Sequence, residues 1–156
     1  MRQALAIVTS AATLFMSIPA PDYTFWVQTE GWFKHVYNPS LPDQLQWYIN
    51  DHTFIRDVNG TWHMFGITHA APADPDHEIE FAHATAPTLQ GPWKKHPSAL
   101  IVDTASGEKH LWAPHVILVN GIYHMFYNAG GEDDKHQIKL ATSTDLFNWK
   151  RFGTLF

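Results

Sequence analysis

The sequence contains no cysteine, few basic residues and little sign of helix. Because none of its 156 residues is Cys, disulfide bonds and thiolate metal sites are excluded. Ten Lys and Arg stand against fifteen Asp and Glu, and the formal net charge of −5 offers no basic field to a nucleic acid. Beyond residue 16 no stretch of ten residues has the 3.6-residue period of an amphipathic helix. We therefore expect a protein with little helix and no nucleic acid partner.

The one long apolar run lies at the N-terminus. Arg2 precedes an almost wholly apolar or small run over residues 4–16, and residues 17–20 resemble a cleavage region. The run is too short to span a bilayer as a helix, so we expect no membrane partner. The sequence predicts a signal peptide over residues 1–20 and a secreted or periplasmic protein. A buried strand or short helix that stays attached is the alternative. Residues 21–46 read as an N-terminal extension, mostly loop with at most one strand.

The remainder of the chain carries one pattern twice. Trp-His-Met-Phe at residues 62–65 returns as Tyr-His-Met-Phe at residues 123–126, each time after an Asn-Gly pair. Asn-Gly between two apolar, aromatic runs is a strong hairpin signal. Each copy contains four runs typical of strands, at residues 47–56, 61–67, 78–85 and 93–102, and then at residues 112–119, 122–127, 137–142 and 149–156.

Four antiparallel strands in each repeat are typical of a propeller blade. The sequence therefore predicts an all-β fold, a β-propeller fragment of two four-stranded antiparallel blades. Blade 1 would span residues 47–104 and blade 2 residues 105–156. A sandwich or barrel is the alternative, but neither would require the same residues to recur in each four-strand unit.

Several motifs resemble those of a known superfamily. Trp-Tyr-Ile-Asn-Asp-His-Thr-Phe-Ile at residues 47–55 resembles the first blade of the five-bladed β-propeller glycoside hydrolases. This β-fructosidase, α-L-arabinofuranosidase and β-xylosidase superfamily includes families 32, 43, 62, 68 and 117. Trp-Ala-Pro-His-Val-Ile at residues 112–117 resembles the start of its second blade, and the blade endings at residues 84–93 and 141–149 are similar to its endings. The resemblance covers about residues 45–156 and implies a carbohydrate substrate.

The resemblance also implies roles for two residues of the inner strands, which line the central funnel of these enzymes. It assigns Asp51 as general base or nucleophile. Asp51 lies in an apolar run, where a carboxylate is costly unless it is paired or faces a cleft. At the second-blade position, where relatives carry Asp, this chain has His115. An imidazole there could assist the reaction, ligate a metal, or have no chemical part. Glycosidic cleavage needs a second carboxyl group, and the third-blade Glu that supplies it has no counterpart in these two blades.

Five further residues are candidate substrate contacts. Trp47 and Trp112 open the inner strands of the two blades, where they could stack on a sugar or pack between blades. His52 adjoins the catalytic candidate, His110 precedes the second Trp, and Asn128 follows a repeated strand close to a Gly-Gly pair. No cofactor is certain, although some relatives hold a divalent cation in the funnel, so a calcium ion there is a further expectation.

Three hypotheses about function follow. The first is a glycoside hydrolase in which a homo-oligomer completes the propeller, because open sheet edges favour association. The second is a carbohydrate-binding half-propeller without catalysis. The third is that the chain is the N-terminal part of a longer five-bladed enzyme.

Overall fold

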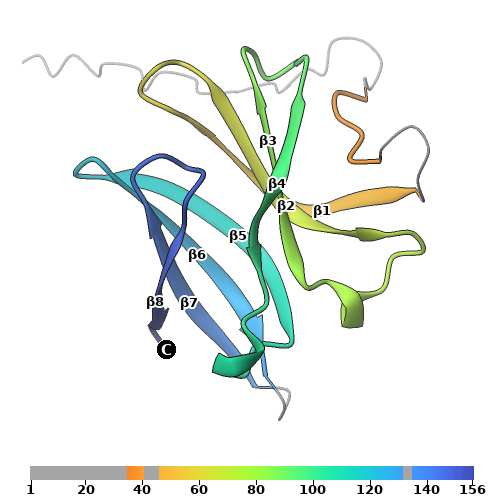
Figure 1. The fold of residues 1–156 in the computed structure, drawn as a ribbon, viewed down its shortest axis with the longest axis vertical. Coiled ribbons are helices and arrows are strands. Elements are labelled where there is room, and N and C mark those ends of the chain that lie inside the picture. Colours follow the sequence, from red (N-terminus) through yellow and green to blue (C-terminus); the bar gives the residue numbers. More distant parts are fainter. Residues whose placement is uncertain (1–34, 41–45, 132–134) are drawn as a thin grey trace, which may run out of the picture. The chain divides into compact units, whose positions relative to one another are not determined.

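The computed structural model describes residues 35–40, 46–131 and 135–156. The expected signal peptide and most of the N-terminal extension lie outside these residues. Within the described ranges the regular structure is eight strands and two short 3-10 turns, η1 (Pro75–His77) and η2 (Thr104–Ser106) (Figure 1). Over the same ranges, no helix has the length and apolar character needed to cross a membrane.

The strands form two four-stranded antiparallel sheets, each in simple sequential order. The first sheet contains β1 (Trp47–Arg56), β2 (Trp62–Ala70), β3 (Glu80–Ala86) and β4 (Lys94–Ile101). The second contains β5 (His110–Val119), β6 (Ile122–Gly130), β7 (His136–Ser143) and β8 (Lys150–Thr154). They correspond one to one to the predicted strands, so the expected all-β fragment of two blades is confirmed, and we call the sheets blade 1 and blade 2.

The two Asn-Gly pairs make different turns. Asn120 and Gly121 both have positive φ, 51° and 79°, and form the tight hairpin between β5 and β6. In blade 1 the hairpin is longer, and the carboxylate of Asp57 accepts hydrogen bonds from the backbone N–H groups of Asn59 (2.9 Å) and Thr61 (2.7 Å). The hairpin signal was therefore correct in both blades, but a side chain closes the first one.

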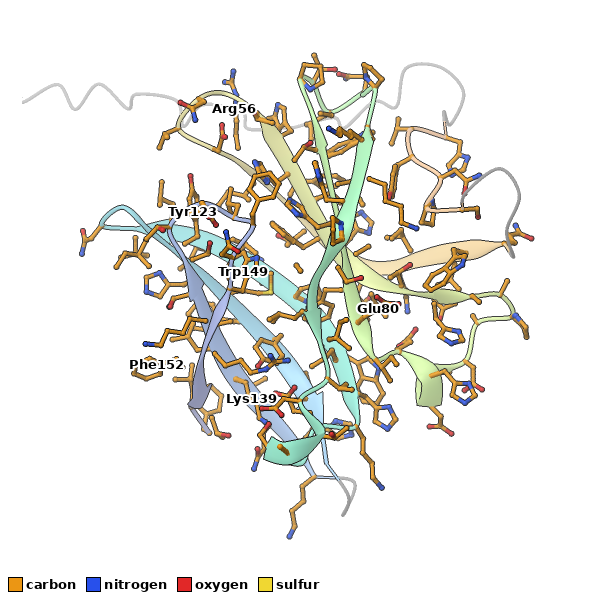
Figure 2. All side chains as sticks on the ribbon, viewed as in Figure 1. Arg56, Glu80, Tyr123, Lys139, Trp149 and Phe152 are labelled. Carbon is orange, nitrogen blue, oxygen red and sulfur yellow. The ribbon has the colours of Figure 1, made fainter. Side chains whose placement is uncertain are left out.

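The core lies between the two blades. Phe65, Ile67 and Phe81 of blade 1 are almost completely buried against apolar residues of blade 2. The rings of Phe81 and Tyr127 meet edge to face at 5.9 Å, and Trp149 meets Phe65 at 5.5 Å. Trp149 and Tyr123, which both belong to or pack against this core, are labelled in Figure 2. Burial of aromatic and branched side chains here is the main force that holds the blades together.

The first strands of the two blades are neighbours, because β5 lies against both β1 and β2. The N–H of Leu111 in β5 donates to the carbonyl of Glu78 in blade 1 at 2.9 Å. The contact of β5 with β1 is the one that a propeller requires, since the first strand of each blade lines the central axis.

A buried carboxylate fixes the loop that leads into β5. Glu108 is fully buried and accepts hydrogen bonds from four donors on different elements. The donors are the hydroxyl of Tyr127 (3.2 Å), the ammonium of Lys139 (3.1 Å), the guanidinium of Arg151 (3.1 Å) and the N–H of Asp103 (2.8 Å). Burial by itself raises the pKa of Glu108, but the Asp103 hydrogen bond and the two cations together lower it below its ordinary value.

The first strand of blade 1 contains a β-bulge. Asn50 pairs with Ile67 and His52 pairs with Gly66, so Asp51 is an extra residue in the ladder. The bulged strand presses closely on Gly66. A Cβ atom at this glycine would lie 2.9 Å from the Cβ of His52 and 3.2 Å from the carbonyl oxygen of Asn50. Glycine at position 66 is therefore a requirement of the bulge.

Replacing Glu108 tests whether its buried hydrogen-bond network stabilises the fold. We expect Glu108→Gln to lower the free energy of unfolding by about 3–5 kcal/mol, because an amide leaves two buried cations without a counter-charge. The lowered pKa means that this contribution is present above about pH 4.5 and is lost as the pH falls through the folded-state pKa. Urea unfolding at pH 7 measures the loss. Glu80→Gln is the control, since Glu80 accepts from Ser98 and has no cation partner among the described residues. Equal losses in the two variants would contradict the assigned role of Glu108.

The close approach at the bulge gives a second prediction. We expect Gly66→Ala to cost about 1–3 kcal/mol of unfolding free energy, because the added methyl group overlaps the β1 backbone. Gly131→Ala serves as the matched variant, since its Cβ would meet only ordinary contacts at 3.6 Å. Thermal unfolding of both variants checks this. A Gly66→Ala protein as stable as the control would mean that the bulge is not tightly packed.

Candidate functional site

The carboxylate of Asp51 stands at the bulge of the first inner strand. The residue is exposed, and its carboxylate forms no hydrogen bond or ion pair with another described residue. Bulges are common next to functional sites because they redirect a side chain out of the regular alternation. A carboxylate in this position is open to accept a hydrogen bond from a ligand or to attack one.

A matching bulge interrupts the inner strand of blade 2. Here Ala113 and Pro114 together oppose the single residue Tyr127. Ala113 has a positive φ of 49°, which only a local irregularity of the strand allows for this residue type. Both blades therefore break their inner strand at the same level.

The pairing register changes the expected equivalence between Asp51 and His115. Phe65 and Phe126 occupy the same position in the repeat, and they pair with Thr53 and His115 respectively. His115 is thus level with Thr53, and Ala113 takes the place of Asp51. His115 is exposed on β5, directly after the bulge. Sequence spacing missed this because the hairpin of blade 1 is longer than that of blade 2.

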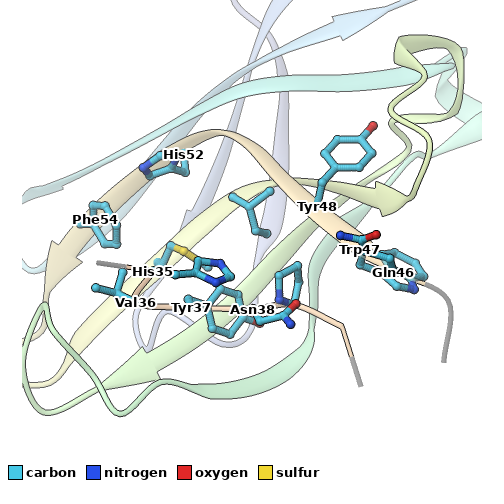
Figure 3. A pocket seen from close by; sticks show the side chains of 12 residues that line it. His35, Val36, Tyr37, Asn38, Gln46, Trp47, Tyr48, His52 and Phe54 are labelled. Atoms are coloured by element: carbon cyan, nitrogen blue, oxygen red, sulfur yellow. The ribbon is translucent and has the colours of Figure 1, made fainter. Parts of the chain in front are cut away.

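Trp47 and His52 line a cavity on one face of blade 1 (Figure 3). The cavity has a volume of about 450 Å³ and lies between β1 and residues 35–40. One side of the Trp47 ring faces the ammonium of Lys95, 5.3 Å from the ring centroid. The hydroxyl of Tyr37 is buried without a hydrogen-bond partner. The other lining residues are His35, Val36, Asn38, Pro39, Gln46, Tyr48, Ile49, Phe54 and Met64.

His110, Trp112 and Asn128 form a second group on blade 2, together with His136. The Trp112 ring is stacked on His110 and on His136, with centroids 5.0 Å apart in each case. Nδ1 of His136 lies 3.1 Å from Oδ1 of Asn128. A Cβ at Gly130 would lie 2.9 Å from the His110 ring, so this glycine makes room for the stack. Trp112 therefore packs on imidazoles of its own chain and is not an open platform.

Two ring nitrogens of this group are unsatisfied. Nδ1 of His110 and Nε1 of Trp112 are buried and have no hydrogen-bond partner. Buried polar atoms without partners are uncommon, and Nε1 of Trp149 is another example in the described residues. Sequence analysis did not single out His136. Its one signal was its place just after the Gly-rich loop that follows Asn128.

Five of the candidate residues thus form two groups, one on each blade. Asp51 and His115 belong to neither group. Within residues 35–40, 46–131 and 135–156 no three His, Asp or Glu side chains are arranged to hold a metal ion. The calcium ion implied by the resemblance therefore has no assigned ligands and stays a prediction.

Comparison with known proteins supports the resemblance at the level of sequence. No protein-family profile matches the chain. A probable arabinan endo-1,5-α-L-arabinosidase A of Neosartorya fischeri is 31% identical over 81 residues, which are 48% of this chain and 25% of that protein. The corresponding protein of Emericella nidulans is 35% identical over 81 residues with the same coverage. The chain spans about a quarter of the length of these curated relatives.

Solved structures support the fold. A family 117 glycoside hydrolase of Zobellia galactanivorans superposes with a TM-score of 0.59 and 16% identity, over 69% of this chain and 38% of that one. Native Bacillus subtilis arabinanase superposes with a TM-score of 0.54 and 19% identity, over 73% of this chain and 39% of that one. The described part of the chain therefore has the fold of two blades of the five-bladed glycoside hydrolase propellers of families 43 and 117, and the resemblance to this superfamily is confirmed.

Proposed function

We propose that this chain supplies the first two blades of a glycoside hydrolase, with Asp51 as its general base or nucleophile. The observation that carries the proposal is the unpartnered, exposed carboxylate at the bulge of the first inner strand. The sequence similarity to arabinan endo-1,5-α-L-arabinosidases suggests an α-1,5-linked arabinan as the substrate. Residues 1–20 fit export, which the breakdown of a polymer outside the cell requires.

Each of the three glutamates in the described residues already has a hydrogen-bond partner within the chain. Glu78 is buried and accepts from the hydroxyl of Tyr48 at 3.1 Å. Glu80 accepts from Ser98, and Glu108 is held by two cations. Glycosidic hydrolysis needs an acid as well as a base or nucleophile. We therefore assign the acid to a second chain or to a part of the protein outside the described residues.

His115 is proposed to assist Asp51. Its imidazole is exposed on the inner strand of the second blade, where it could donate a hydrogen bond to a sugar hydroxyl or to the leaving oxygen. Because the pairing register separates it from the level of Asp51, we assign it to the neighbouring part of the substrate and not to the same atom.

Sugar contacts are proposed for both residue groups. The cavity beside Trp47 and His52 has the volume of an ordinary ligand pocket and combines aromatic walls with the unpaired Tyr37 hydroxyl. In the second group the exposed His136 ring and the half-buried Asn128 amide are the groups that a sugar hydroxyl could reach, at the edge of the His110 and Trp112 stack.

A second copy of the chain is the proposed source of further blades. Phe65 and Phe81 of blade 1 are 0% exposed beneath blade 2. Their register equivalents on blade 2 are Phe126 and Ile138, which are only half-buried, and Ile117 beside them is 36% exposed. Blade 2 thus repeats, on its open face, the apolar pattern that packs against a blade elsewhere in the molecule.

Hydrolysis of debranched arabinan tests the proposed activity. We expect Asp51→Asn to lower the release of reducing ends by about 10²–10⁴-fold, because the amide can neither accept a proton nor attack the sugar. Asp76→Asn is the matched control, because it makes the same change at an exposed carboxylate of η1 that lines neither candidate group. The assay is run on fractions from size-exclusion chromatography with light scattering, where activity is expected in a species larger than one 17.8 kDa chain.

The same experiment separates the alternatives. Undiminished hydrolysis by Asp51→Asn would contradict the role of Asp51. Arabino-oligosaccharide binding by calorimetry with no hydrolysis in any fraction would favour the carbohydrate-binding half-propeller, a candidate favoured by the engagement of every described glutamate. Activity confined to the monomer would contradict assembly from several copies.

A further inference from the structure

Three histidines, two buried and one half-buried, form a row across blade 1, outside the groups described above. His63, His83 and His96 lie on the adjacent strands β2, β3 and β4. Nδ1 of His63 and Nε2 of His83 are 2.9 Å apart, and the ring centroids of His83 and His96 are 5.0 Å apart. His63 is 1% exposed and His83 is 2% exposed. We call these three residues the histidine row.

The row has a defined polar partner at each end. Nε2 of His63 lies 3.7 Å from a carboxylate oxygen of Asp57, and Nε2 of His96 lies 2.7 Å from the hydroxyl of Thr85. Phe65 stacks on His83 with centroids 4.6 Å apart. The row therefore links the hairpin of blade 1 to its outer strand through rings that have little access to water.

Blade 2 covers the row with one side chain. Phe147, in the turn between β7 and β8, contacts all three imidazoles, with centroids 5.4, 4.8 and 5.2 Å from those of His63, His83 and His96. The turn itself is rigid, because the carboxylate of Asp145 accepts from the N–H groups of Phe147 and Asn148. Phe147 is the residue of this turn that contacts the histidine row, while Leu146 and Trp149 of the same turn pack in the core beside Phe65.

The blade fold does not require these histidines. By register, the equivalent of His83 in blade 2 is Leu140, since both pair with the repeated Phe. A leucine satisfies the packing of a blade at this position. Imidazoles at the seam are therefore a special feature of blade 1, and they bring titratable groups to a place that an apolar side chain could fill.

Protonation of the row is unfavourable in the folded protein. Burial is the main cause that lowers the pKa of His63, His83 and His96, and the neighbouring imidazoles add to it at His83, whose pKa falls to about 3. The charged groups that face the row are Asp57, Asp145 and Lys94, of which the carboxylates favour protonation and the lysine opposes it.

The direction of the resulting pH dependence follows from these shifts. The folded-state pKa of each imidazole lies below its ordinary 6.5, so the unfolded chain binds more protons as the pH falls. The row contributes fully to stability above about pH 6.5, and its contribution is lost progressively between pH 6.5 and about pH 3.

We propose that the histidine row is an acid-sensitive latch between the blades. Neutral imidazoles hold Phe147 and its turn against blade 1. In mild acid the open form, in which water reaches the imidazoles, binds protons that the closed form excludes, so acid shifts the equilibrium toward release of the turn. The latch would thereby loosen blade 2 in an acidic environment without any change at Asp51.

Two substitutions at the centre of the row test the latch. His83→Leu installs the residue that blade 2 carries at this position, and His83→Gln keeps a hydrogen-bonding group opposite His63 without a titratable ring. Between pH 7 and pH 5 we expect the folding equilibrium constant of the wild-type chain to fall about 25-fold more than that of either variant, from urea unfolding. His124→Gln, at the register equivalent of His63, is the matched control and should retain the wild-type pH dependence.

Hydrogen exchange locates the release. With labelling times corrected for intrinsic exchange rates, residues 143–150 of the wild-type protein should lose protection between pH 7 and pH 5, and those of the His83 variants should not. Equal pH dependence in wild-type and variant proteins would overturn the proposal. Full protection of residues 143–150 in wild-type protein at pH 5 would also overturn it, even if neither variant folds.

Discussion

The interaction on which the rest of the structure depends is the fourfold hydrogen bonding of one buried carboxylate. Glu108 precedes β5 and draws together the end of blade 1, the middle strands β6 and β7 of blade 2 and its last strand, β8. Two cations and two further donors offset the cost of burying the charge, which would otherwise be several kcal/mol. Arg151 also donates to the carbonyl of Ile101, so the network reaches the last strand of blade 1. The start of the second inner strand is thereby fixed relative to the first.

The relative position of the two inner strands, β1 and β5, determines which side chains lie side by side at the candidate site. Both strands interrupt their ladders with a bulge at the same level of the repeat, but only blade 1 has an acidic residue there. Asp51 is presented by a break in the backbone pairing, and Gly66 permits that break by having no side chain. The chemistry of the site and the local irregularity of the fold thus have one origin.

Much of the fold could be predicted from the sequence, because a repeat of strands separated by turn residues leaves few alternatives. The bounds of β1 were predicted to the residue, and the two hairpins fell at the Asn-Gly pairs. The difference in level between Asp51 and His115 could not be predicted, since it depends on where a bulge falls and on one hairpin being longer. Spacing along the chain does not record either feature.

Side-chain partnerships were also beyond the sequence. Glu108 contacts Lys139 and Arg151 only in the folded blade, where strands far apart in sequence are neighbours. The sequence therefore gave no sign of these ion pairs. The stacking of Trp112 on two imidazoles likewise depends on the space above Gly130. Trp47 and His52 line one cavity, and their role as substrate contacts stays a prediction.

The seam between the blades combines two kinds of constraint. Its apolar part, around Phe65 and Phe81, supplies most of the favourable free energy of association. Its polar parts, the Glu108 network at one place and the histidine row at another, fix geometry and respond to pH. The protein thus keeps its inner strands in position with groups whose charge state matters, while the carboxylate of Asp51 remains open to solvent.

The central claim is that this open carboxylate is where a sugar is held. The most direct measurement is a crystal structure of the full chain with bound arabinotriose. The account predicts a sugar hydroxyl or ring oxygen within hydrogen-bonding distance, about 2.5–3.0 Å, of the Asp51 carboxylate. Arabinotriose bound only in the cavity beside Trp47, with Asp51 still in contact with solvent alone, would contradict it.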